Sequence, residues 1–158
     1  MKELADELRG AVREARTRLE AIDKKGSLTM GPGTWSKRQI LGHLIDSALN
    51  NDQRFVRAPS SETLDFPDYE QDAWVAAHDY AERPWAELVA LWALLNEQVA
   101  SAIERLPSDR LATPCRIGGG DAQTLEFVAT DYPKHMQHHL LQILDPAAAA
   151  GRRYPRLA

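Results

Sequence analysis

The sequence predicts an all-α protein, a four-helix bundle with a long connection between its second and third helices. Two observations lead to this prediction. Apolar residues recur at spacings of three and four along four stretches, which is the pattern of one face of a helix: 3–24, 36–57, 84–105 and 124–144. No stretch alternates apolar and polar residues over more than a few positions, as a half-buried strand would. Four such helices bury their apolar faces against one another.

The first two helices have recognisable ends. The apolar stripe of the first is formed by Leu4, Leu8, Val12, Ala15, Leu19 and Ile22. Glycines from Gly26 onward end this helix. Ser36 is suited to the N-cap of the second helix, and Gln39, three residues later, completes a capping box. The second helix is expected to end near Ala58.

The connection that follows, about residues 60–83, is long for a compact domain. Pro67 argues against a continuous helix. A short helix is expected within 69–80, with Trp74 and Val75 facing inward. Because long connections often line a site or cross the end of a bundle, we expect this one to lie across one end.

The last two helices are bounded by proline and glycine. Pro84 suits the first turn of the third helix. A run of three glycines that begins at Gly118 predicts a turn before the last helix. Pro133 lies within the last helix and is expected to kink it. We expect one domain over 1–146 and a loosely ordered tail over 147–158.

Composition limits the partners and the compartment. The net charge is −4, and no dense basic run offers a face for phosphates, so a nucleic-acid partner is not expected. Cys115 is the only cysteine, which excludes an intrachain disulfide and fits a reducing compartment. No apolar run approaches the ~18 residues of a membrane span, and the acidic N-terminal residues do not resemble a signal peptide. We therefore expect a cytoplasmic protein with no membrane partner.

Three histidines are the strongest chemical signal in the sequence. His135 and His139 are four residues apart, so on a helix both rings project from one face and can reach one metal ion. His138 stands about 100° further round the helix and is expected at the rim. His43, inside the second helix, can complete the set because a bundle brings facing helices together. Three imidazoles leave a fourth position for water or substrate, as in catalytic metal sites.

These residues and their neighbours also have structural interpretations. A histidine pair at this spacing also occurs at half-buried helix edges, and a lone histidine such as His43 is more often structural than functional. Asp46, Asp131 and Gln142 stand at helical spacing from the histidines, where each can accept the spare ring N–H of a ligand. For Asp131 and Gln142 this role and a solvated position are equally supported. For Asp46 we favour a solvated helix face.

Other polar residues have simpler explanations. His78, in the long connection, is expected to be exposed, although it can reach the rim of a pocket. Cys115 is a nucleophile only if a neighbouring base or cation lowers its pKa, and a single cysteine is more often inert. Arg54 shares an edge of the second helix with His43 but stands ~16 Å along it, too far to touch the same metal. It can still anchor an anionic tail of a substrate.

Two blocks of the sequence resemble motifs of the DinB-like superfamily. Residues 35–47, WSKRQILGHLIDS, are similar to its second-helix motif, and residues 131–143, DYPKHMQHHLLQI, are similar to its last-helix motif. The resemblance extends over about residues 5–146. It implies a four-helix bundle that binds a divalent metal, often zinc or nickel, through histidines that are by position His43, His135 and His139. It also implies a homodimer, and the better understood relatives use low-molecular-weight bacterial thiols in transfer or isomerisation.

Two functional hypotheses follow. The first is a divalent-metal-dependent enzyme that transfers or hydrolyses a small molecule, with a low-molecular-weight thiol as a possible co-substrate. The second is a non-catalytic bundle in which the metal is sensed or stabilises the fold. We favour the first because three ligands leave an open position and no fourth strong ligand is evident. The absence of an obvious general base in the sequence counts against it.

Overall fold

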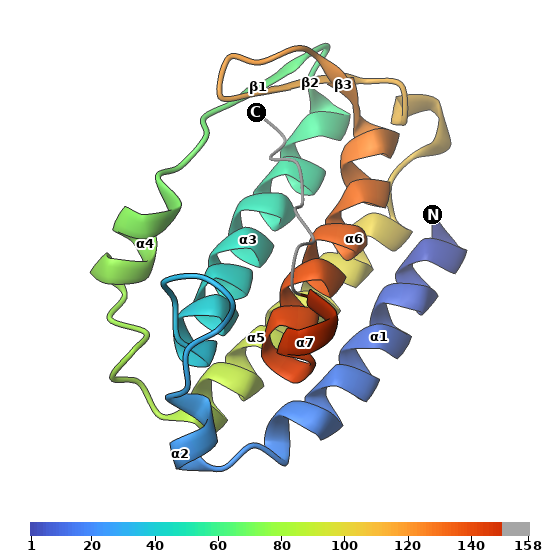
Figure 1. Ribbon diagram of the computed structural model, residues 1–158. Coiled ribbons are helices and arrows are strands. Elements are labelled where there is room, and N and C mark those ends of the chain that lie inside the picture. Colours follow the sequence, from blue (N-terminus) through green and yellow to red (C-terminus); the bar gives the residue numbers. More distant parts are fainter. Residues whose placement is uncertain (150–158) are drawn as a thin grey trace.

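Four long helices form the body of the protein, as the computed structural model shows for residues 1–149 (Figure 1). They are α1 (Lys2–Glu20), α3 (Lys37–Arg57), α5 (Trp85–Glu104) and α6 (Leu125–Leu144). The predicted all-α four-helix bundle is confirmed. The ends of α3, α5 and α6 lie within one residue of those expected from the sequence.

The first helix ends at Glu20, earlier than expected, because a new helix begins at Lys24. Asp23 acts as the N-cap of α2 (Lys24–Ser27), and its Oδ1 accepts a hydrogen bond from the backbone N–H of Gly26 at 2.6 Å. That cap requires an extended backbone at Asp23, which α1 cannot supply. The start of α3 follows the prediction more closely, since Ser36 and Gln39 form the expected capping box.

The long helices pack as a ring in which α5 contacts both α1 and α3 on one side. On the other side α6 contacts the same two helices, so that α1 and α3 occupy opposite corners (Figure 1). The core lies where the four apolar stripes meet. Its largest fully buried side chains are Leu8, Leu19, Leu41, Leu44, Ile45, Phe55, Tyr80, Leu88, Trp92, Ile103, Leu125 and Met136.

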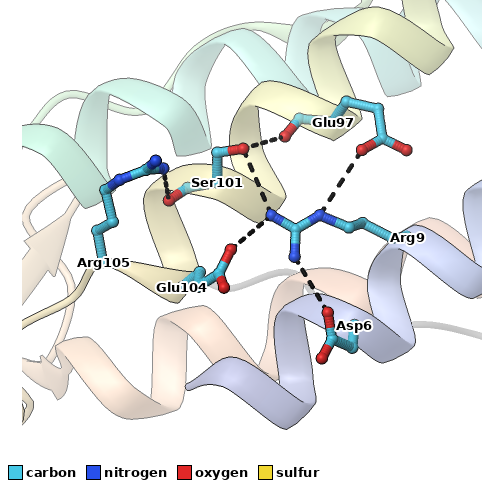
Figure 2. Close-up of polar contacts among 6 residues, drawn as sticks. All are labelled: Asp6, Arg9, Glu97, Ser101, Glu104 and Arg105. Carbon is cyan, nitrogen blue, oxygen red and sulfur yellow. Dashed lines mark hydrogen bonds and ion pairs between the residues drawn. The ribbon is translucent and has the colours of Figure 1, made fainter.

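Arg9 joins α1 to α5 at the edge of this core (Figure 2). Its Nη2 donates a hydrogen bond to Glu104 Oε2 at 2.7 Å and lies 3.5 Å from Ser101 Oγ. Its Nε lies 3.7 Å from Glu97 Oε2, and its Nη1 donates to Asp6 Oδ1 at 3.2 Å. Water reaches these groups and screens their charges, so the cluster orients α1 on α5 more than it stabilises the fold.

A small sheet closes the end of the bundle where α3 ends and α6 begins (Figure 1). Its strands are β1 (Leu64–Phe66), β2 (Pro114–Ile117) and β3 (Gln123–Thr124). β1 runs parallel to β2, and β2 runs antiparallel to β3. The strands are too short for alternation to be visible in the sequence. The predicted glycine turn joins β2 to β3, with positive φ angles of 63° at Gly118 and 77° at Gly119 that suit glycine.

The long connection was expected to lie across one end of the bundle, but only its first part, β1, does so. The rest runs along the outside of α3 (Figure 1). The expected short helix is α4 (Gln71–Ala77), and it packs against α3. Val75 is buried and Trp74 is half-buried. The Tyr80 ring lies directly on Gly42 of α3, because a Cβ at that position would stand 2.1 Å from Tyr80 Cδ2. These apolar contacts draw the connection along the helix.

The described chain ends in a short helix, α7 (Pro146–Ala149), that packs against α6. The tail predicted over 147–158 falls mostly outside the described residues. α6 continues through Pro133, which is buried within it. Among residues 1–149, no helix is both long and apolar enough to cross a membrane.

Candidate metal centre

His43, His135 and His139 lie together between α3 and α6, which run side by side in opposite directions (Figure 1). One nitrogen from each ring falls within 4.8 Å of the other two. The Nε2 atoms of His43 and His135 are 3.4 Å apart. Nitrogens bound to one ion at 2.0–2.1 Å in a tetrahedral arrangement stand about 3.3 Å apart. His43 and His135 therefore already have the separation that a divalent transition metal requires, and all three rings supply a suitable donor within 4.8 Å.

The two histidines of α6 converge because they are one turn apart on the same face. Their ring centroids are 4.6 Å from each other, and each lies close to the ring of His43, at 5.3 Å for His135 and 4.8 Å for His139. His138 is not among these potential ligands; its Nε2 lies 3.3 Å from Gln142 Nε2. His138 thus lies beside the group, with its ring centroid 5.1 Å from that of His139, but not within it, as expected. That the other three bind a metal remains a prediction.

Two side chains orient the rings of α6. His139 Nδ1 donates a hydrogen bond to Gln142 Oε1 at 2.8 Å, which leaves its Nε2 as the free lone pair. Ser47 Oγ lies 3.4 Å from His135 Nδ1. From the sequence, contact with a ligand histidine and a solvated position were equally supported for Gln142. The position of Ser47 beside His135 was not predicted. Its position one turn after His43 on α3 was the available signal.

The site favours neutral imidazoles. Burial lowers the pKa of His135 well below its ordinary value, and the neighbouring charges of His139 and His43 lower it further. Burial also lowers the pKa of His139 to about 4, although the hydrogen bond with Gln142 opposes this shift. Both rings are therefore uncharged near pH 7, with nitrogen lone pairs available for a metal.

A sequence profile of the DinB superfamily matches residues 7–143. The chain belongs to the DinB superfamily. It is 30% identical over 123 residues to a "putative metal-dependent hydrolase" of Oceanobacillus iheyensis, covering 77% of this chain and 69% of that protein. It is 27% identical over 115 residues to a protein of the same name from Halalkalibacterium halodurans, covering 73% of this chain and 67% of the relative.

The fold is also found in YfiT from Bacillus subtilis, described as "a probable metal-dependent hydrolase with an unusual four-helix bundle topology". The two structures have a TM-score of 0.76 over 97% of this chain and 91% of YfiT. Their sequences are 23% identical, so this likeness concerns the fold.

In this DinB-superfamily chain Asp46 is fully buried, and the solvated position favoured from the sequence is wrong. Its Oδ1 accepts a hydrogen bond from the Tyr80 hydroxyl at 2.7 Å and lies 3.0 Å from His78 Nδ1. Burial raises the pKa of Asp46, although these two partners oppose the shift. The long connection covers Asp46 and shields it from water. Asp46 thus fastens that connection to α3 one turn from His43.

The remaining candidates differ in how closely they approach the histidines. His78 is 43% exposed, as expected, and contacts Asp46. Asp131 is half-buried on α6, and its predicted role stays a prediction. Cys115 is buried in β2, where its Sγ lies 3.6 Å from the Thr113 carbonyl oxygen. Because burial raises the pKa of the Cys115 thiol, this cysteine is expected to be inert.

The depressed histidine pKa values predict acid sensitivity of the metal-free protein. His139 titrates near its ordinary 6.5 when unfolded and at about 4 when folded, so the folded state binds fewer protons between these values. Stability is therefore expected to fall as the pH drops through this range, by roughly 2–3 kcal/mol from His139. Asp46 acts in the opposite direction because its pKa is raised.

Urea unfolding with a chelator present, from pH 7.5 to pH 4, measures this loss. The His139→Gln variant is the control and should lose less stability over the same range. An equal loss in the variant and in the wild-type protein would show that His139 is not the source.

Proposed function

We propose that the protein is a divalent-metal-dependent enzyme that hydrolyses a small molecule or transfers a group to it, with His43, His135 and His139 as the metal ligands. The observation that carries the proposal is the convergence of three imidazole nitrogens, from two different helices, within 4.8 Å. Within residues 1–149 no fourth histidine, cysteine or carboxylate belongs to this group. A three-ligand set is the arrangement of catalytic metal sites rather than structural ones.

When bound, a divalent metal at three imidazoles lowers the pKa of water or a thiol in its open position and so supplies hydroxide or thiolate at neutral pH. Zn²⁺ and Ni²⁺ both suit imidazole ligands. The protein's own contribution is orientation. Gln142 holds the His139 ring, and Ser47 faces the Nδ1 of His135. His43 is fully buried beside Trp35, with 5.2 Å between ring centroids.

Relatives support the choice of reaction. Both bacterial relatives carry the name "putative metal-dependent hydrolase". The better understood members of the superfamily that the histidine blocks resemble use low-molecular-weight thiols, which makes such a thiol the leading co-substrate. The predicted homodimer and the cytoplasmic location remain predictions.

Metal loading followed by nucleophile titration tests the proposal. The purified protein is loaded with Zn²⁺, Ni²⁺ or Co²⁺, and the visible spectrum of the Co²⁺ form is followed as small thiols are added. We expect thiolate charge-transfer bands, and turnover of activated esters or other electrophiles by the Zn²⁺ or Ni²⁺ form. If metal binds but no thiol changes the spectrum and no electrophile is consumed with thiol or water, the non-catalytic interpretation is correct.

A further inference from the structure

Arg54 is a buried cation to which the proposed metal centre gives no role. It lies on α3, eleven residues after His43, with 6% of its surface exposed. Its Nη1 approaches Asn51 Oδ1 at 3.4 Å, and its Cζ lies 5.2 Å from the centre of the Phe66 ring. Within residues 1–149 no carboxylate oxygen lies within 4 Å of it, and its Nε has no hydrogen-bond partner. Burial lowers the pKa of Arg54, and the nearby Tyr69 and Asp68 only oppose this shift.

The other buried arginine of α3 shows what a structural arginine looks like in this fold. Arg38 donates its Nε to Ser27 Oγ and its Nη1 to the Ala81 carbonyl oxygen, both at 3.0 Å. These bonds tie α2 and the long connection to the start of α3. Among residues 1–149, Arg54 makes one long hydrogen bond, to the side-chain amide of Asn51, in place of the two shorter ones of Arg38. A guanidinium held out of water with so few partners is unfavourable unless a ligand completes them.

A line of polar contacts leads from Arg54 to the histidines. Asn51 Nδ2 lies 3.4 Å from Ser47 Oγ, and Ser47 Oγ lies 3.4 Å from His135 Nδ1. These residues belong to one buried polar face of α3, formed by His43, Asp46, Ser47, Asn50, Asn51 and Arg54. Because these residues are spaced three and four apart, they form one continuous strip of the helix surface from His43 to Arg54.

The distance between His43 and Arg54 along α3 corresponds to the length of a small molecule. Eleven residues rise about 16 Å along a helix. The Arg54 guanidinium reaches back to Asn51, three residues earlier on α3, which shortens that span. The Phe66 ring lies against the guanidinium and holds its plane. The N–H groups at the edge of that plane form a fork that matches a carboxylate or a phosphate.

We propose that Arg54 binds an anionic group, a carboxylate or a phosphate, of the substrate whose reacting group lies at His43, His135 and His139. The proposal rests on the proposed function for the position of the reacting group. The competing explanation is that Arg54 is only a structural contact for β1 through Phe66. The two explanations predict opposite effects on stability. A ligand-binding arginine without its ligand destabilises the fold, so Arg54→Met is expected to keep or raise the Tm. A structural contact would make the same variant less stable.

Binding of matched metal chelators measures the anion preference. The Co²⁺ form is titrated with monohydroxamates of succinic, adipic and suberic acid, and with uncharged hydroxamates of equal length. Hydroxamate anchors at the metal whichever nucleophile the enzyme uses. At one length we expect the acid to bind about tenfold or more tightly than its uncharged partner. Arg54→Gln should remove this ratio without weakening the uncharged ligand, and Arg54→Lys should retain part of it.

Arg57 provides the matched control. It lies one turn further along α3, is exposed, and donates Nη2 to Gln53 Oε1 at 3.0 Å. Arg57→Gln should leave the ratio unchanged. No preference for the acid at any length, or a preference that survives Arg54→Gln, would overturn the proposal.

A second measurement, on the metal-free protein, distinguishes failure of the metal proposal from failure of the anion-site proposal. Inorganic phosphate and suberate are added separately, and the Tm of the wild-type protein and of Arg54→Gln is compared. We expect one of the two anions to raise the Tm of the wild-type protein only, and which one does so separates phosphate from carboxylate. If no hydroxamate changes the Co²⁺ spectrum but this difference is present, the metal proposal fails and the anion site stands. If neither anion discriminates the two proteins, the anion site is refuted.

Discussion

Replacing His139 by alanine is expected to reduce the affinity for Zn²⁺ by at least about 100-fold, more than the loss of an outer partner of a metal ligand causes. The His139 nitrogen is one of three within 4.8 Å, and its removal leaves two ligands that cannot enclose an ion. Competition with a chromophoric chelator at pH 7.5 measures the change.

His138→Ala is the matched control, because it removes the adjacent imidazole from the same turn of α6. His138 contacts Gln142 and the edge of the His139 ring but is not one of the potential ligands, so the expected loss is less than about tenfold. Equal losses in the two variants would mean that His139 is not a ligand. His43→Ala should match His139→Ala, since the site needs donors from both helices.

Replacing Gly42 by alanine is expected to destabilise the protein by about 3 kcal/mol, although the same change in a helix is normally stabilising by up to about 1 kcal/mol. The new Cβ would stand 2.1 Å from Tyr80 Cδ2 and 2.2 Å from Tyr80 Cγ, so the ring has to move. Movement of Tyr80 also breaks its hydrogen bond to the fully buried Asp46. Overpacking and the loss of that hydrogen bond each cost about 1–3 kcal/mol.

Gly10 of α1 offers the matched control for this prediction. A Cβ at Gly10 meets only Arg13 Nη2, at 4.0 Å, so Gly10→Ala should raise stability by about 0.5–1 kcal/mol. Urea unfolding of the metal-free proteins measures both changes. If both variants change the free energy of unfolding in the same direction, the packing of the Tyr80 ring does not require a glycine at position 42.

Much of this protein could be read from local patterns. Ser36 and Gln39 form a capping box within four consecutive residues, and this is why the start of α3 was predicted to within a residue. The spacing of His135 and His139 determined that their rings share a face, because a helix repeats about every four residues. Gln142 was also within reach of local reasoning, since it lies three residues after the histidine that it contacts.

The tertiary structure alone decided what covers α3. Asp46 looked solvated from its own helix, yet Tyr80, thirty-four residues later, encloses it and donates a hydrogen bond to it. Ser47 reaches His135 across eighty-eight residues of sequence. The three strands are too short to show their period, and they exist because β2 aligns β1 and β3. Helix position follows from contacts within four residues, but burial and partners depend on which distant segments pack together, and no local period encodes that choice.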